Sequence, residues 1–353
     1  ISLIYFSGMF ASAIAGSVVE ALRPDRIIVL ELGLFASGLL LIATGSVTAI
    51  VAGSLLLGVG YGLNNPASSE ILNRDTPRNR HSLVFSLKQS GVPVGAVLAN
   101  LSLPALTLAL GGAWQLAILV AAVLPAVLLV VSAATLRPSE PMRRFDGGVV
   151  ARMVRDQRDL YRNARLRTLA VLGGLFSALQ LVATAFTVVM LVDLGWSIVA
   201  AGSVAAALQC TGAVGRVAWG LFADRFGSFQ TLALIGTLSG LILLSLLFVA
   251  DYAAPVQVAL LVGLGGLASG WNGVFLAAAA RSAPAGKVGA NTGALLVYTF
   301  IGVIVGPSLF AGLYEVTGSF GLCFALFSGI GFLGAALSVM QFRPVSARGQ
   351  GSS

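Results

Sequence analysis

The chain has 353 residues, of which 57% are hydrophobic and 10% charged, and its mean hydropathy is +0.95. No soluble globular domain has this balance, so a soluble protein is excluded. The net charge of +8 would indicate nucleic-acid binding in a soluble protein, but beside membrane spans basic residues face anionic headgroups, and no nucleic-acid partner is expected.

Apolar stretches of about 20 residues recur along the chain, and each is long enough to cross the bilayer as a helix. Eleven spans are predicted, at residues 1–19, 27–45, 48–71, 83–109, 113–135, 169–192, 198–223, 229–250, 255–279, 289–313 and 319–342. This pattern predicts an all-α membrane protein, with the lipid bilayer as its surroundings.

The loops between these spans differ in charge. Alternate loops carry the basic residues: Arg23 and Arg26; Arg74, Arg78 and Arg80; nine Arg from Arg137 to Arg167; Arg225; Arg281 and Lys287; and Arg343 and Arg348. The other loops hold Asp193, Asp251 and Glu315, with no Lys or Arg. By the positive-inside rule the basic loops and the C-terminus are cytoplasmic, which indicates a multi-pass protein of the cytoplasmic (inner) cell membrane.

The first span ends at a basic loop, so its other end faces the outside, and the chain begins with Ile rather than Met. We therefore expect that one preceding helix is missing from the sequence and that the complete protein has twelve.

The longest polar stretch, 137–167, separates five spans from six. Apolar residues recur within it at near-helical spacing, which predicts an amphipathic helix on the membrane surface; a solvated linker is the alternative. The expected organisation is an N-terminal bundle (1–136, helices 2–6), a cytoplasmic central loop (137–167), a C-terminal bundle (168–342, helices 7–12) and a disordered cytoplasmic tail (343–353).

Three pairs of motifs recur at an offset of slightly more than 200 residues. GSVVE (Gly16–Glu20) matches GLFAD (Gly220–Asp224), GVGYGLN (Gly58–Asn64) matches GLASGWN (Gly266–Asn272), and GVPVG (Gly91–Gly95) matches GVIVG (Gly302–Gly306). All three pairs fall in corresponding helices in the same order, which indicates that the two halves repeat one another.

The segment Gly220-Leu-Phe-Ala-Asp224-Arg225-Phe-Gly227 resembles the loop signature Gly-x-x-x-Asp-Arg-x-Gly of the major facilitator superfamily, and the resemblance covers almost the whole chain. It implies two six-helix bundles with pseudo-two-fold symmetry, of which eleven of twelve transmembrane helices are present. The N-terminal copy departs from the signature, because Glu20 replaces the Asp and Ala21 the Arg.

A carboxylate at a helix end can pair with an Arg of its loop and with the positive N-terminus of a helix from the other half. Such contacts exist only while the cytoplasmic side is closed. We therefore expect the signature residues to form a conformational latch, or, as the alternative, only to fix the loops. These gating candidates are Gly16, Glu20, Gly220, Asp224, Arg225 and Gly227.

Arg216 lies eight residues before Asp224 and hence about 12 Å from the helix end, near the middle of the hydrocarbon. A charge at this depth should face a cavity or an anionic partner. Because a guanidinium makes paired hydrogen bonds to carboxylate or phosphate, Arg216 favours recognition of an organic anion; a structural or gating pair is the alternative. An Arg in this helix also resembles the monocarboxylate and oxalate/formate branches of the superfamily.

The other charges inside predicted spans are closer to helix ends. Lys88 is a second candidate for solute binding, although its long stem could instead bring the ammonium to the interface. Glu31 and Glu70 lie nearer the cytoplasmic ends, and Arg74 is the natural partner of Glu70 one turn away. We expect no midplane carboxylate to neutralise Arg216.

Polar and amphipathic residues inside the spans are candidates to line the same cavity, with interhelical hydrogen bonding as the alternative for each. They are Gln89, Asn64, Asn65, Gln180, Gln209, Trp271, Asn272 and Tyr298.

The resulting interpretation is secondary active transport of a small solute, in particular an organic anion such as a carboxylate, by alternating access. A coupling ion (a proton) or a counter-substrate is the expected further partner, since no GxxxxGK[ST] nucleotide motif is present. No metal-ligand spacing or cofactor motif occurs, and an enzyme is not expected. Two alternatives stay open: a proton-coupled drug or cation exporter whose carboxylate lies in the missing first helix, and a transport-inactive sensor with the same fold.

Overall fold

The computed structural model describes residues 2–135 and 148–342, and the regular elements in these ranges are all helices. The expected disordered tail (343–353) and the first part of the central loop lie outside the described residues. In the described part, ten helical segments are long and apolar enough to cross a membrane, or eleven if one bent pair counts as a single span. The predicted all-α membrane fold is therefore confirmed.

The first bundle contains α1 (Ser2–Ala13), α2 (Ala15–Leu22), α3 (Pro24–Ala43), α4 (Val47–Asp75), α5 (His81–Ala109) and α6 (Trp114–Thr135), with a 3-10 turn, η1 (Arg78–Arg80), before α5. The second bundle contains α8 (Ala164–Asp193), α9 (Ile198–Phe226), α10 (Ser228–Ser245) continued by the 3-10 helix η2 (Leu246–Asp251), α11 (Ala254–Ala268), α12 (Trp271–Ser282), α13 (Val288–Thr317) and α14 (Phe320–Val339). Between them, α7 (Val149–Arg162) packs against α2, α8 and α13 and buries Leu160, whereas its apolar residues Val150 and Val154 are exposed.

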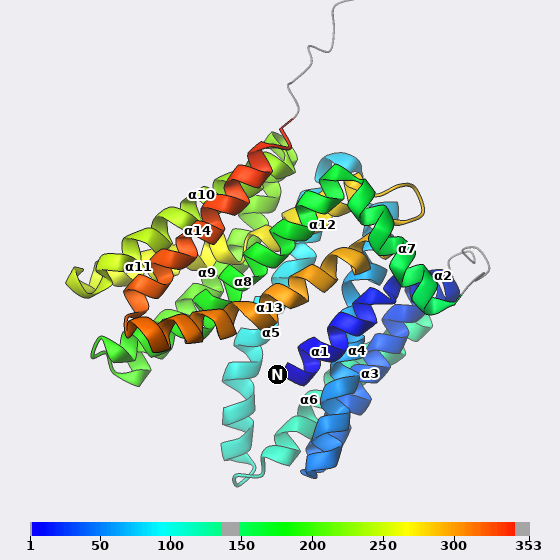
Figure 1. The fold of residues 1–353 in the computed structure, drawn as a ribbon. Coiled ribbons are helices and arrows are strands. Elements are labelled where there is room, and N and C mark those ends of the chain that lie inside the picture. The colour runs from blue at the N-terminus through cyan, green and yellow to red at the C-terminus, as the bar shows by residue number, and fades with distance from the viewer. Residues whose placement is uncertain (1, 136–147, 343–353) are drawn as a thin grey trace, which may run out of the picture.

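The two bundles contact each other mainly through α5 and α13. α5 packs against α9 and α12 of the second bundle, and α13 packs against α1, α2 and α4 of the first. Figure 1 shows the bundles meeting at the end where α7 lies and separating toward the opposite end, where the α5–α6 and α8–α9 turns lie. We call the first of these the Arg-rich end, because Arg74, Arg225 and Arg281 are located there, and the other the acidic end, after Asp193 and Asp251.

The predicted span 1–19 is interrupted in the structure. α1 and α2 meet at Ile14 with a bend of 63°. Beyond the bend, Gly16 of α2 lies so close to α13 that a Cβ on it would come within 2.9 Å of the Ala290 Cβ. The bend thus brings α2 into contact with the second bundle. The sequence did not indicate this bend, because position 14 is neither Pro nor Gly.

The bundles differ in how they are packed. The second contains two large buried clusters, one around Phe176, Trp271 and Phe275 and one in which Phe310 contacts the rings of neighbouring Phe residues. The first contains a small cluster of mainly short side chains, and a Cβ on Gly62 would lie 2.8 Å from that of Ala11. Short residues there let α1 and α4 approach closely.

The repeated GVPVG and GVIVG motifs have different surroundings. Gly302 and Gly306 lie against α8, where a Cβ on Gly306 would meet the Ala178 Cβ at 2.8 Å, whereas Gly91 and Gly95 of α5 face open space. Gly91 and Gly95 therefore lack the close helix contact that their counterparts make, and Figure 1 shows the bundles separating toward this end.

Candidate functional site

A cavity of about 120 Å³ lies between the bundles, at the level where α5 and α9 are in contact. Six of the candidate residues line it, namely Asn65, Gln89, Gln180, Arg216, Trp271 and Asn272. The other lining residues are Tyr5, Tyr61, Val92, Ser177, Leu181, Phe275, Leu276, Leu296, Thr299, Phe300 and Val303. The cavity thus combines one cation, several amides and hydroxyls, and an apolar and aromatic wall.

Arg216 of α9 is 2% exposed and is held by main-chain carbonyls from both bundles. Its Nε donates to the Ser269 oxygen at 3.0 Å, and its Nη1 donates to the Gln89 oxygen. Among the described residues no carboxylate forms an ion pair with it. In this part of the chain, the carbonyl dipoles of Ser269 and Gln89 stabilise its positive charge.

Both carbonyls are available because a helix is interrupted beside them. The Gln89 oxygen would normally accept from the amide four residues later, but that residue is Pro93, which has no N–H. Ser269 follows the last residue of α11, where the break before α12 leaves carbonyls without intrahelical donors. Two helix irregularities thus create the binding site for one guanidinium.

A second polar group joins α8 to α12. Gln180 Oε1 accepts from Trp271 Nε1 at 3.1 Å and from Asn272 Nδ2 at 2.9 Å. Gln180, Trp271 and Asn272 therefore form interhelical hydrogen bonds, which was the alternative to a cavity role, and they also line the cavity. The hydrogen bonds fix the positions of these side chains on the cavity wall.

Lys88 does not extend to the interface as its stem would allow. Its Nζ donates to Asn64 Oδ1 and Asn65 Oδ1, both at 2.6 Å, and to Gln89 Oε1 at 3.2 Å. Because these acceptors lie inside the first bundle, the ammonium stays within the protein. Asn64 and Lys88 do not line the cavity but lie behind Gln89, which does.

Asn64 also connects Lys88 to a buried carboxylate. Its Nδ2 donates to Glu31 Oε1 at 2.6 Å, and Glu31 is only 3% exposed. Glu31 Oε2 has no hydrogen-bond partner among the described residues. The sequence places Glu31 near a helix end, whereas the structure buries it in a network of opposite charges bridged by one amide.

Two candidate residues lie elsewhere. Gln209 lines a second cavity toward the acidic end, together with Val97 and Leu101 of the first bundle and Thr184 of the second. Tyr298 OH donates to Gln157 Oε1 of α7 at 2.9 Å and so contacts the Arg-rich end rather than the central cavity.

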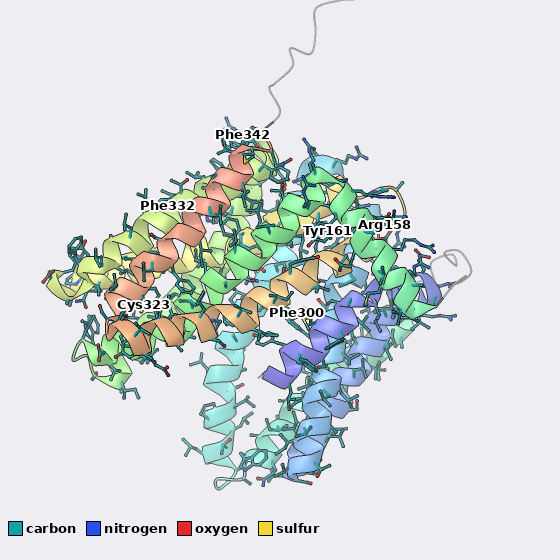
Figure 2. The ribbon with its side chains drawn as sticks, in the orientation of Figure 1. Arg158, Tyr161, Phe300, Cys323, Phe332 and Phe342 are labelled. Carbon is teal, nitrogen blue, oxygen red and sulfur yellow. The ribbon has the colours of Figure 1, made fainter. Side chains whose placement is uncertain are left out.

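Three aromatic residues of the cavity wall, Tyr5, Tyr61 and Phe300, were not identified from the sequence. Tyr61 contacts Tyr5 and Phe300, with ring centroids 6.3 Å and 5.8 Å away, and Phe300 of α13 lies beside α1 (Figure 2). The repeat contained a signal for Tyr61, because the alignment of GVGYGLN with GLASGWN pairs Tyr61 with Ser269, and both positions border Arg216.

At the Arg-rich end Asp224 connects the two bundles. Its two carboxylate oxygens accept from the main-chain N–H groups of Ser82 and Leu83, each at 2.8 Å, at the start of α5. This is the expected contact with a helix N-terminus of the other half. Arg225 does not pair with Asp224 but lies over the Phe226 ring, 5.4 Å from its centroid. The nearest cation is Arg281, with Nη1 3.8 Å from Asp224 Oδ1.

Gly220 and Gly227 of the signature lie near the contact between Asp224 and α5. A Cβ on Gly220 would lie 2.7 Å from the Ser86 Cβ of α5, so this position lets the bundles approach. Gly227 has φ +101°, which favours glycine and turns the chain from α9 into α10.

The N-terminal copy makes different contacts. Glu20 forms an ion pair with Arg152 of α7, while Glu70 of α4 accepts from the Gly289 N–H at the start of α13, at 2.7 Å. The expected Glu70–Arg74 pairing is wrong, because Arg74 pairs with its neighbour Asp75. Glu70 thus makes the helix N-terminus contact in one half that Asp224 makes in the other.

Two packed helical bundles, joined at one end and enclosing a polar cavity between them, define a membrane transporter. The family model described as Major Facilitator Superfamily matches residues 1–307, and the chain belongs to this superfamily. The protein is therefore a secondary transporter and not an enzyme. Among the described residues, no group of three or more His, Cys, Asp or Glu could hold a metal ion.

Solved transporter structures share the fold. The E. coli fucose:proton symporter FucP superposes with a TM-score of 0.80 at 15% identity, covering 97% of this chain and 90% of that one. The human organic anion transporter MFSD10 gives 0.79 at 19% identity (96% and 82%), and the proton:xylose symporter XylE bound to 6-bromo-6-deoxy-D-glucose gives 0.72 at 15% (96% and 84%). A search of curated proteins finds no match.

Proposed function

We propose that the protein transports a small organic anion, such as a carboxylate, across the cytoplasmic (inner) cell membrane by alternating access. The observation that carries this proposal is the site of Arg216, a cation without a carboxylate partner among the described residues at the wall of a cavity between the bundles. A solute carboxylate would supply the missing negative charge.

The proposal of alternating access is supported by a difference between the two ends of the molecule in how the bundles contact each other. Contacts from Asp224 and Glu70 to helix N-termini join the bundles at the Arg-rich end, while Gly91 and Gly95 face open space toward the acidic end. With the Arg-rich end on the cytoplasmic side, as the positive-inside rule requires, the C-terminus is cytoplasmic and this arrangement faces outward. Residues 1–136 and 168–342 would then rock as two units about the central site, with Gly16, Glu20, Gly220, Asp224, Arg225 and Gly227 as gating residues.

The buried Glu31 favours proton coupling. Glu31 is 3% exposed, and one of its oxygens has no hydrogen-bond partner in the part of the chain that the structure describes, so taking up a proton would stabilise it. Asn64 links it to Lys88 and thereby to Gln89 at the cavity. Co-transport of one proton with a monoanion would be electroneutral. The same carboxylate supports the second candidate, a proton-coupled exporter of cations or drugs.

A binding screen separates the two candidates. The melting temperature of the purified protein is measured with panels of carboxylates, neutral sugars and lipophilic cations, since a ligand that binds only the folded state raises it. Stabilisation by carboxylates that is lost in Arg216→Gln supports the anion transporter. Stabilisation by cations that is lost in Glu31→Gln supports the exporter and contradicts the anion proposal.

A further inference from the structure

A third cavity, of about 210 Å³ and with a polar lining, lies at the Arg-rich end within the second bundle, where the starts of α8 and α10 meet the end of α12. Its lining consists of Arg165, Ser228, Phe229, Gln230, Ala278, Arg281, Ser282 and Gln341. We propose that this cavity binds a phosphate group, either of an anionic phospholipid headgroup or of a free phosphate.

The charge of the lining points to an anion. Arg165 and Arg281 both border the cavity, and its described lining contains no Asp or Glu. Among the described residues, Asp224 lies 3.8 Å from Arg281, and both of its oxygens accept from main-chain N–H groups. Two guanidinium groups in one cavity are the arrangement that recognises phosphate.

The start of α10 adds donors to the same place. Gly227 supplies no side chain as cap, so the first N–H groups of α10, beginning at Ser228, lack a side-chain acceptor. Arg281 Nη2 donates to Ser228 Oγ, which holds the guanidinium beside this helix N-terminus. Guanidinium groups and a helix N-terminus together form a recognised type of phosphate site.

A phospholipid headgroup is one source of such a phosphate. Phe226 and Phe342, close in sequence to the lining residues Ser228 and Gln341, are 50% and 41% exposed and so offer apolar surface near these segments. A phospholipid would place its phosphate in the cavity and its acyl chains along these residues.

The test measures binding by the purified full-length protein to three probes: inorganic phosphate, short-chain phosphatidylglycerol and short-chain phosphatidylcholine. Arg165→Gln is compared with Arg167→Gln, an exposed Arg of the same helix start that does not line the cavity. We expect the dissociation constant for phosphate or phosphatidylglycerol to rise roughly tenfold in Arg165→Gln and to stay unchanged in Arg167→Gln. Binding of free phosphate identifies a soluble source; binding of phosphatidylglycerol alone identifies a headgroup.

A second variant distinguishes a loss of phosphate binding from a loss of folded protein. Gln230 is exposed in the first turn of α10, where a Glu stabilises the helix, so Gln230→Glu should keep or raise the melting temperature while weakening phosphate binding. No binding of either anionic probe, equal binding of phosphatidylcholine, or equal losses in the Arg165 and Arg167 variants would overturn the proposal. Because neither Arg165 nor Arg167 lines the central cavity, a loss of binding in Arg165→Gln alone distinguishes this cavity from solute binding at Arg216.

Discussion

Arg216 donates to the main-chain oxygen of Gln89, a carbonyl that Pro93 leaves without its intrahelical donor. This bond joins α9 of one bundle to α5 of the other beside the central cavity, in addition to the contacts that Asp224 makes with α5 at the Arg-rich end. The charge of the cavity and one of the contacts between the bundles therefore depend on the same side chain, which links solute recognition to the relative position of the bundles.

Replacing Pro93 by Ala should weaken that link. An Ala amide can donate to the Gln89 oxygen and compete with Arg216, while the helix interior gains up to about 3 kcal/mol in helix propensity. We expect solute affinity to fall although the melting temperature holds or rises. Pro104→Ala, in the same helix but away from Arg216, is the matched control; equal affinities of the two variants would contradict this account.

Asp224→Asn should loosen the Arg-rich end. A neutral amide keeps one acceptor but loses the charge that interacts with the α5 N-terminus, which is worth about 0.3–2 kcal/mol. Cysteines introduced on α5 and α9 at this end should crosslink less efficiently, because the lost interaction lowers the fraction of molecules in which this end is closed. Arg225→Gln serves as the comparison, because Arg225 does not contact Asp224; equal crosslinking by wild type and Asp224→Asn would rule out the latch.

Asn64→Leu should uncouple Glu31 from Lys88. The substitution removes both the donor to Glu31 and one acceptor of Lys88, and leaves a buried carboxylate without its described partner, at a cost of about 1–3 kcal/mol or more. Proton-driven uptake should fall more than exchange of solute for solute, which needs no net proton movement. An Asn64→Leu protein that retains its response to a pH gradient would exclude this network from coupling.

Asp156 of α7 should make docking of this helix depend on pH. Burial raises the pKa of the Asp156 carboxyl above its usual value, against the opposing effect of Arg152 and Lys287. A raised pKa means that the folded state holds the proton more tightly than the unfolded state does. The resulting contribution to the free energy of unfolding is complete below the unfolded pKa of about 3.9, and it is lost as pH rises through the raised pKa of the folded state. Asp156→Asn should therefore stabilise the protein near pH 7 and flatten the pH profile of its melting temperature.

The control for this effect is Asp159→Asn. Asp159 pairs with Lys287 at 3.1 Å between side chains that are 36% and 46% exposed, so its loss should lower stability by less than about 1 kcal/mol. If both variants shift the melting temperature in the same direction at pH 7, burial of Asp156 does not govern the docking of α7.

The fold could be predicted because the length and apolar composition of each membrane span are local properties of the sequence. The site could be predicted in part: Arg216, Gln89, Gln180, Trp271 and Asn272 are polar or amphipathic groups in apolar helices, and such groups face the protein interior. Tyr5 and Phe300 could not be identified, since an aromatic residue in a span suits lipid as well as a cavity.

Contacts between helices that are far apart in the chain could not be predicted from the sequence. Lys88 was placed by its depth in a single helix, but its direction depends on Asn64 and Asn65 of another. Likewise Glu70 has an Arg one turn away, yet it binds the start of α13, which only the packing of the two bundles brings within reach. Local pairing rules therefore failed where a helix from elsewhere in the chain offered a better partner.

The most direct test of the central claim is uptake of a labelled carboxylate, chosen from the binding screen, into proteoliposomes containing wild type, Arg216→Lys or Arg216→Gln. We predict that wild type accumulates the solute, that Arg216→Lys retains part of the rate, and that Arg216→Gln loses it roughly tenfold or more, since a charged hydrogen-bonded group is removed. Uptake by Arg216→Gln equal to that of wild type would contradict the account.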